Sequence, residues 1–293
     1  MSACVIDNES GQWSDEQIAA IHHKVWLHGE VSLLYVDGRT EVALFSCVGR
    51  PTFWQGGRAV YCPAETLREG LEDAAKIARY SANRLCDGSF WQDEETGRLA
   101  DSDQAAHQRL VRKIAEVDRA LLGAKKPWLR RLLLLTVLVK YLEDRRVFPE
   151  AWFARYLPRA TSFLDILQRG GADCLLRLFG DLEQKFNGGI FAFAQEADRL
   201  AQADMRTLAE LVEARTENGQ REFWELYSFE YIPVEVISAI YEEFADREKG
   251  AVFTPPLAVR LLLDFAIPYP TIRGDERILD PTCGSGVFLV SAY

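Results

Sequence analysis

The spacing of apolar positions changes three times along the chain. It begins with a predicted helix whose apolar face comes from residues three or four apart, which are Ile18, Ile21, Val25 and Trp26. Ser14 can cap this helix, Gln17 three residues later completes a capping box, and Gly29 can end it. The first element is therefore expected to be a short amphipathic helix.

Two strand-like runs follow this helix, at residues 31–36 and 41–48. The dipeptide Asp37-Gly38 lies between them and is typical of a hairpin turn. Together with the helix, these runs predict a small β-containing module over residues 1–63.

The spacing turns helical at residue 64 and stays so to about residue 248. Residues 128–147 are apolar through their middle, which predicts a helix buried in the centre of a bundle. No repeat of fixed period occurs, so this part is expected to be a helical domain and not a solenoid.

The pattern changes again over residues 249–293. Thr254 is a plausible helix cap with Pro255 at the first helical position, and a short strand is predicted at residues 277–280. A glycine-containing turn and a new helix follow it. The expected class is therefore mainly α: a helical domain, the small amino-terminal module, and the start of an α/β Rossmann-like domain.

Composition narrows the classes of protein. With 293 residues, 48% hydrophobic and 27% charged, the chain is expected to be globular, with about two domains. The nearly apolar stretch at residues 132–139 is far shorter than the roughly 20 residues of a membrane span. The start of the chain lacks the features of a signal peptide, and the six cysteines form no CxxC pair. We expect a soluble cytoplasmic protein without a metal site and without a membrane partner.

Charge is distributed unevenly. The net charge is −10, but residues 109–159 contain thirteen basic and five acidic residues, a local charge of +8. This segment could form a weak, sequence-independent surface for double-stranded DNA, and the residues considered for it are Arg130, Arg131, Arg145 and Arg146. The alternative is a solvated helix surface whose arginine stems cover the core.

The clearest chemical motif is at residues 278–288, Ile-Leu-Asp-Pro-Thr-Cys-Gly-Ser-Gly-Val-Phe. A hydrophobic strand, an acidic residue, a glycine turn and a helix start are typical of a nucleotide-type site, since Gly284 and Gly286 allow the backbone to approach a ligand. The full dinucleotide pattern GxGxxG is not met. A strand–helix turn without a ligand remains the alternative.

The string from Asp280 to Phe288 resembles the S-adenosylmethionine-binding motif of N6-adenine DNA methyltransferases of restriction–modification systems. The family's upstream Gly-x-x-Tyr/Phe-Thr-Pro segment is matched by residues 250–255. Residues 141–145, 186–191 and 231–238 resemble, less specifically, the helical region of large type I-like or fused methylases. The resemblance implies methyl transfer from S-adenosylmethionine to adenine N6, with DNA and restriction or specificity subunits as partners.

The resemblance also implies which residues hold the cofactor. Residues 280–286 would hold its methionine and ribose parts, and residues 253–255 would close the other side of the pocket. The full set implied is Phe253, Thr254, Pro255, Asp280, Pro281, Cys283, Gly284, Ser285 and Gly286. Cys283 is not expected to act as a nucleophile, because its sequence neighbours include no histidine or lysine.

The chain also departs from the family. The family's Asn/Asp-Pro-Pro-Tyr/Phe loop, which holds the target base, does not occur, and the one Pro-Pro pair follows Thr254. We therefore expect no catalytic residue in this chain, which would be the amino-terminal part of a methyltransferase, inactive by itself and binding the cofactor poorly. A nuclease site is not expected, because the Glu41-Val-Ala run lacks the lysine such a site needs. The alternative function is a non-enzymatic helical module that binds DNA or a partner.

Overall fold

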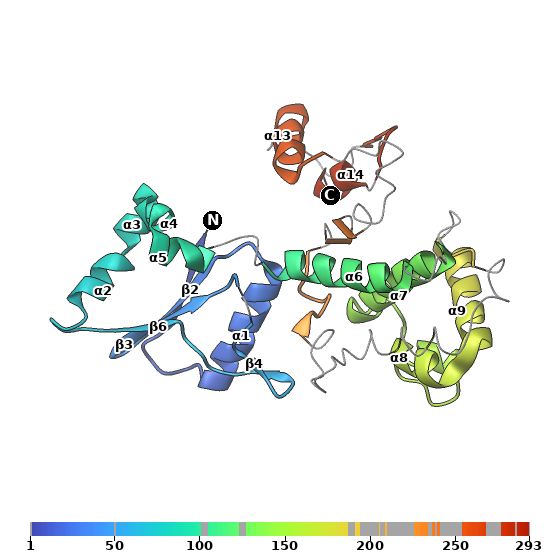
Figure 1. Ribbon diagram of the computed structural model, residues 1–293, viewed down its shortest axis with the longest axis horizontal. Helices are drawn as coiled ribbons and strands as arrows, with labels where there is room; N and C mark the ends of the chain where they lie inside the picture. Colours follow the sequence, from blue (N-terminus) through green and yellow to red (C-terminus); the bar gives the residue numbers. More distant parts are fainter. Residues whose placement is uncertain are drawn as a thin grey trace. The chain divides into compact units, whose positions relative to one another are not determined.

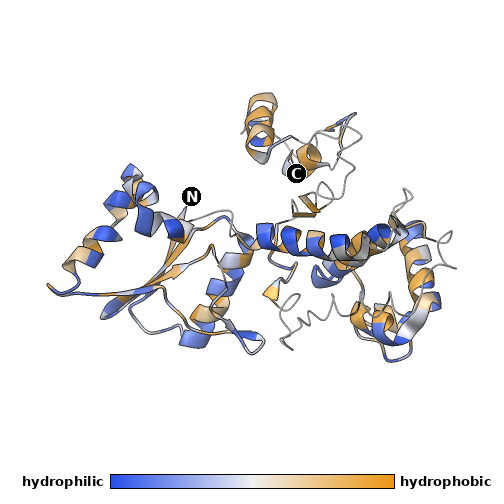
Figure 2. Cartoon of the chain, in the orientation of Figure 1, coloured by the Kyte–Doolittle hydropathy of each residue, from blue (hydrophilic) through white to orange (hydrophobic). Residues whose placement is uncertain are grey.

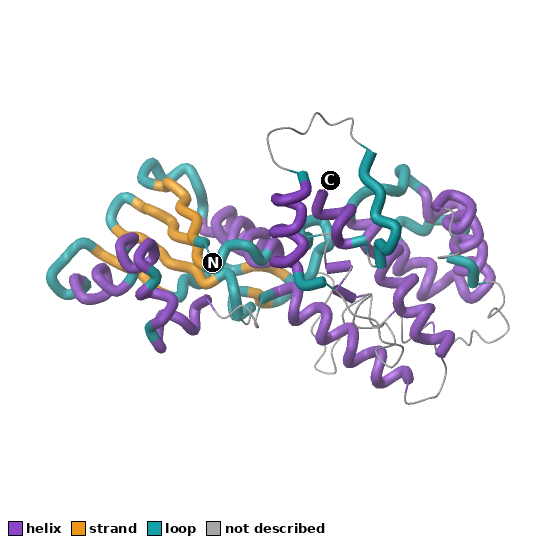
Figure 3. The backbone as a smooth tube through the Cα atoms, turned by 90° about the horizontal axis from the view of Figure 1, so that it is seen from above, coloured by secondary structure: helices purple, strands orange, loops and turns teal. Residues whose placement is uncertain are grey.

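A computed structural model describes most of the chain. The described residues are 2–49, 51–100, 105–122, 127–186, 191–193, 205, 209, 226–233, 236, 237, 239, 240, 254–267, 277–284 and 286–292. The chain divides into two compact units, one of residues 1–110 and 135–232 and the other of residues 111–134 and 233–293. Most described elements are helices, which confirms the predicted mainly α class (Figure 3).

The first unit contains a four-stranded mixed sheet in the order β1-β2-β3-β6 (Figure 1). Its strands are β1 (Ala3–Asn8), β2 (Leu33–Gly38), β3 (Glu41–Ser46) and β6 (Glu65–Arg68). β1 is parallel to β2, whereas β2–β3 and β3–β6 are antiparallel. The predicted hairpin is confirmed, but its turn is Arg39-Thr40, because Asp37 pairs with Val42 and stays in the ladder. A two-stranded sheet follows, formed by β4 (Trp54–Gln55) and β5 (Arg58–Ala59).

Helix α1 (Asp15–His28) connects β1 to β2 and begins and ends as predicted. The Ser14 hydroxyl accepts from the Gln17 amide at 3.3 Å, and the Gln17 side chain accepts from the Ser14 amide at 2.9 Å. Gly29 ends the helix in the left-handed conformation, with φ 74°. The helix packs on one face of the sheet, in a core made of Ile18, Leu34, Val36, Ala43, Phe45 and Cys47.

The opposite face of the sheet is covered by short helices. These are α2 (Ala74–Arg79), α3 (Ala82–Asp87), α4 (Ser89–Gln92) and α5 (Glu94–Gly97), followed by the turn η1 (Arg98–Ala100). The core on this side contains Leu33, Tyr35, Leu44 and Phe90. Since successive residues of a strand point to opposite faces, β2 is buried on both sides.

Long helices form most of the described chain between residues 106 and 186. They are α6 (Ala106–Leu122), α7 (Pro127–Asp144) and α9 (Gly171–Phe186), with η3 (Trp152–Arg155), α8 (Phe163–Asp165) and η4 (Ile166–Gly170) between the last two. The predicted buried helix is confirmed, because Leu132, Leu133, Leu135 and Val139 of α7 are buried. It ends at Asp144, three residues before the predicted end, because the backbone turns left-handed at Arg146. No helix within the described ranges is long and apolar enough to cross a membrane.

The carboxyl-terminal part of the second unit contains α13 (Pro256–Ala266) and α14 (Val287–Ala292). Pro255 lies at the cap position with ψ 142°, one residue later than the predicted Thr254 cap, because a residue before proline disfavours helical backbone. The predicted strand at residues 277–280 is wrong: the segment is irregular. No described strand lies beside it to complete a sheet, and a lone strand is unstable.

Candidate functional site

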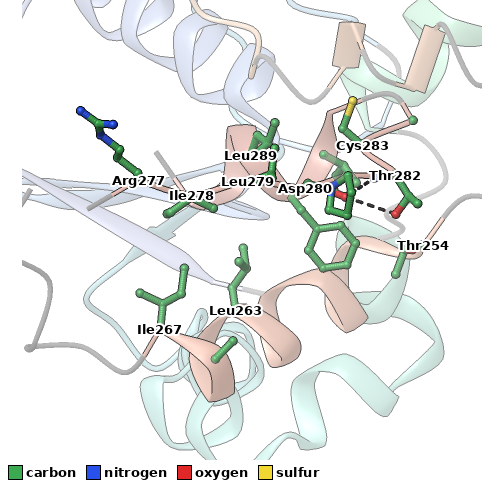
Figure 4. A pocket seen from close by; sticks show the side chains of 15 residues that line it. Thr254, Leu263, Ile267, Arg277, Ile278, Leu279, Asp280, Thr282, Cys283 and Leu289 are labelled. Carbon is green, nitrogen blue, oxygen red and sulfur yellow. Dashed lines mark hydrogen bonds between the residues drawn. The ribbon is translucent and has the colours of Figure 1, made fainter. Parts of the chain in front are cut away.

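An open cavity of about 750 Å³ lies within the second unit (Figure 4). It is bounded by α13, by the irregular segment at residues 277–284 and by α14. Its apolar lining comes from both helices and the segment, and comprises Leu263, Ala266, Ile267, Ile278, Leu279, Val287, Phe288 and Leu289. The two helices and the glycine motif therefore border one space.

The carboxyl-terminal part of one stripe of α13 contributes to the apolar side of this cavity. Val259, Leu263 and Ile267 follow one another at intervals of four residues, so they share one side of the helix. Val259 is fully buried, and the side chains of Leu263 and Ile267 point toward residues 277–280 (Figure 4). This stripe gives the cavity a surface that suits a flat apolar group.

Asp280 is the one acidic residue among the described residues of the lining. Its Oδ1 atom accepts from the Thr282 amide at 2.9 Å and from the Thr282 hydroxyl at 3.3 Å. This side chain–backbone turn holds the carboxylate in place. Its other oxygen, Oδ2, has no partner among the described residues, so it can accept a hydrogen bond from a ligand.

The glycines of the motif have left-handed backbone conformations. Gly284 has φ 53° and Gly286 has φ 81°. The Gly286 amide donates to the Cys283 carbonyl at 2.6 Å, and the Val290 amide donates to the Gly286 carbonyl at 2.9 Å, which starts α14. A Cβ atom at Gly286 would meet nothing within 4 Å, so backbone conformation, and not crowding, is the reason for glycine here.

The cavity is widely open to solvent. Leu279 is 84% exposed and Ile278 is 49% exposed, and Cys283 is also exposed. An open site desolvates a ligand only in part, and its polar contacts are correspondingly weak.

The residues implied by the motif take different places. Thr254, Asp280, Pro281, Cys283 and Gly284 line the cavity. Pro255 caps α13, and Gly286 directly precedes α14. Phe253 and Ser285 lie outside the described residues.

Sequence reasoning did not identify the contribution of α13. Leu263, Ala266 and Ile267 line the cavity, although only the start of this helix was assigned to the site. The four-residue spacing of Val259, Leu263 and Ile267 could have indicated an inward face. Thr282 was also missed as the residue that positions Asp280.

The four arginines considered for DNA lie in different surroundings. Arg130 and Arg131 belong to the second unit, and Arg145 and Arg146 belong to the first. Arg130 is paired with the buried carboxylate of Asp118, at 2.9 Å. Arg145 donates to the Ile232 carbonyl at 2.8 Å, whereas the side chain of Arg146 is 82% exposed.

The described part of the chain contains no group of three or more His, Cys, Asp or Glu residues able to hold a metal ion. Its six cysteines are free thiols, of which Cys47 and Cys174 are buried. The polar side chains that line the cavity are those of Asp280, Thr282, Thr254, Arg277 and Cys283, beside the backbone of the glycine turn.

Comparison with protein families gives a match to the family model of N-6 DNA methylases at residues 234–293, which are 60 of the 293 residues. The match includes the whole cavity and confirms the resemblance of residues 250–293 to that family. Comparisons with curated proteins and with solved structures give no match.

Proposed function

We propose that the cavity of the second unit is part of the S-adenosylmethionine site of an adenine-specific DNA methyltransferase with a Rossmann-like catalytic domain. The observation that carries this proposal is the position of the cavity within residues 234–293, the segment that matches the N-6 DNA methylases. The cofactor would supply a methyl group on a sulfonium sulfur, and the acceptor would be N6 of adenine.

The residues present fit such a cofactor. The free oxygen of Asp280 can accept a hydrogen bond from a ribose hydroxyl, as a carboxylate after a strand-like segment does in other nucleotide sites. Gly284 and Gly286 let the backbone approach the methionine part closely. Leu263 and Ile267 offer an apolar surface to the adenine ring. The cofactor would thus be held by the Asp280 carboxylate, by the glycine turn and by the apolar stripe of α13.

Methyl transfer needs further residues to hold the target base. An Asn/Asp-Pro-Pro-Tyr/Phe segment does not occur in the 293 residues. The chain alone is therefore expected to bind the cofactor weakly and to leave DNA unmethylated, because positioning of the amine supplies much of the rate enhancement. The complete enzyme would act in restriction–modification or phage defence, with restriction or specificity subunits as partners.

Alkylation of Cys283 tests the cofactor site directly. This thiol is exposed and lines the cavity, whereas Cys86 is exposed elsewhere. Millimolar S-adenosylmethionine should slow the reaction of Cys283 with iodoacetamide, measured by peptide mass spectrometry, and should leave Cys86 unchanged. Asp280→Asn should reduce this protection. Equal alkylation of Cys283 with and without the cofactor would contradict the proposal.

A second candidate is a non-enzymatic module that binds a protein partner. It is supported by the outer side of α13, where Leu257, Leu261 and Phe265 are 80%, 69% and 89% exposed. Figure 2 shows that this helix is largely hydrophobic. Large exposed apolar patches are typical of interaction surfaces. Leu261→Asp combined with Phe265→Asp should abolish binding of such a partner without changing Cys283 protection, which separates the two candidates.

A further inference from the structure

A second cavity, of about 560 Å³, lies in the first unit after the end of α7. It is lined by Glu143 and by residues between Arg146 and Thr161. These residues lie outside the segment that matches the methylase family. The size falls within the roughly 300–1,000 Å³ of small-molecule pockets.

Aromatic rings form much of its wall. Phe148 stacks on Trp152, with ring centroids 5.5 Å apart and an angle of 12° between the planes. Phe153 is buried edge-on to Phe148, at 5.4 Å. The indole N–H of Trp152 is buried without a hydrogen-bond partner. The cavity therefore has an aromatic wall, one ring of which carries a buried N–H without a partner.

Three residues at this cavity have an unusual backbone conformation. Among the described non-glycine residues, left-handed φ values occur at Arg146 (56°), Ala151 (59°) and Arg159 (64°), and all three line the cavity. Such a conformation costs an L-residue about 1–2 kcal/mol compared with glycine. Two of the three positions are arginines, so a long cationic side chain is present where glycine would be more stable.

For Arg146 the reason for this conformation is clear. The Val147 amide donates to the Leu142 carbonyl at 3.0 Å, and the Arg146 amide donates to the Glu143 carbonyl at 2.9 Å. These two bonds form the motif that ends many helices, in which glycine is usual at the position of Arg146. The backbone motif does not require the guanidinium.

Two arginines, Arg146 and Arg159, line the cavity, and Arg155 lies beside it. The Arg146 side chain is 82% exposed, and its contact with Glu230 is long, at 3.6 Å. Arg155 lies over the Trp152 ring at 4.5 Å and is 3.6 Å from Asp181.

Two carboxylates also line the cavity. Glu143 is already engaged, because it accepts from Lys140 at 3.1 Å and from the Phe163 amide at 2.9 Å. Glu150 is exposed and offsets part of the positive charge. The lining therefore carries two arginines and two glutamates. Because Glu143 is paired with Lys140, Arg146 and Arg159 can serve an anion, and guanidinium groups suit phosphate.

We propose that this cavity binds an unpaired nucleotide of a DNA strand, with the base against Phe148 and Trp152 and the phosphate at Arg146 and Arg159. Base–aromatic stacking and arginine–phosphate pairing are the two contacts by which proteins hold single strands. The choice of DNA rests on the proposed function, whereas the cavity and its chemistry do not depend on the cofactor site.

Fluorescence anisotropy of a labelled single-stranded oligonucleotide tests this proposal on the full chain without cofactor. The variant Arg146→Gln/Arg159→Gln should bind about tenfold more weakly, since two charge-assisted contacts are lost. The matched control Arg98→Gln removes an arginine whose side chain is 75% exposed on the sheet side of the unit, and it should bind like the wild type. Phe148→Leu should also weaken binding, and an oligonucleotide with abasic positions should bind more weakly than the intact one.

Several outcomes would overturn the assignment. These are absence of binding by the wild type, an equal loss in Arg98→Gln, or unchanged binding in Arg146→Gln/Arg159→Gln. Equal affinity for intact and abasic strands, or displacement of the strand by inorganic phosphate as effectively as by adenosine monophosphate, would exclude a base in the cavity. If S-adenosylmethionine does not protect Cys283 while the oligonucleotide binds normally, the proposed cofactor site is rejected and the nucleotide cavity is not.

Discussion

Arg130 of α7 places its guanidinium against Asp118 of α6, with Nη2 2.9 Å from Oδ2 and Nε 3.3 Å from both carboxylate oxygens. The Asp118 side chain is only 5% exposed. A buried carboxylate without its partner is strongly unfavourable. We therefore expect Arg130→Ala to lower the free energy of unfolding by about 3 kcal/mol, measured by urea denaturation.

The double variant Arg130→Met/Asp118→Leu provides the matched control. It removes both charges and keeps apolar volume, so it should be more stable than Arg130→Ala. If the single and double variants unfold at the same urea concentration, the loss does not come from the unpaired carboxylate.

His22 should make stability depend on pH. Burial lowers its pKa from 6.5 to about 4, and its Nε2 atom lies 2.9 Å from the Ser46 carbonyl. The unfolded chain binds the proton more readily than the folded chain. The stability that neutral, buried His22 contributes is therefore fully present above pH 6.5 and is lost as pH falls toward 4. The total loss is about 3 kcal/mol by linkage. Burial lowers the pKa of His23 too, which acts in the same direction.

Chemical denaturation between pH 7.5 and 4.5 measures this effect. His22→Gln should flatten the dependence, whereas His28→Gln should not, because the His28 side chain is 55% exposed. An unchanged pH profile in His22→Gln would assign the acid sensitivity to other groups.

Arg146→Gly should raise the free energy of unfolding by about 0.5–1 kcal/mol, because glycine adopts the left-handed conformation without strain. The neighbouring substitution Arg145→Gly is the control and should destabilise, since it removes the bond to the Ile232 carbonyl. Thermal unfolding of both variants checks the signs. A destabilised Arg146→Gly would show that the exposed guanidinium contributes to the fold.

Thiol reactivity should follow burial. Burial raises the pKa of the Cys47 thiol, whereas Cys4, Cys86 and Cys283 are exposed. In native protein, three thiols should react rapidly with a disulfide reagent and Cys47 only after unfolding. Rapid modification of Cys47 in folded protein would contradict the packing around β3.

Local features of the fold were predictable and long-range pairing was not. Ser14, Gln17 and Gly29 identify both ends of α1 because capping depends on neighbours in sequence. Strand β1 was missed, since its six residues are largely exposed and its partner β2 lies beyond α1. An edge strand of this kind has neither a strong alternating pattern nor a turn beside it.

The candidate site likewise has a part that the sequence could predict and a part that it could not. The glycine turn and Asp280 could be identified from a contiguous motif, and the helix that completes the cavity is separated from them by more than ten residues. The roles of the arginines could not be predicted. The partner of Arg130 is twelve residues away and that of Arg145 is 87 residues away, so only the folded chain brings them together.

Burial of β2 on both faces affects how the register between β2 and its neighbouring strands is determined. Leu33, Leu34, Tyr35 and Val36 are all buried, so shifting the strand by one residue would exchange one set of apolar side chains for another. Polarity therefore cannot distinguish the native alignment from its neighbour. The two-residue turn after Gly38 and the bond from the Tyr35 hydroxyl to the Tyr80 carbonyl, 3.2 Å long, must carry that information. We expect a longer turn at this point to bring the two alignments closer in free energy.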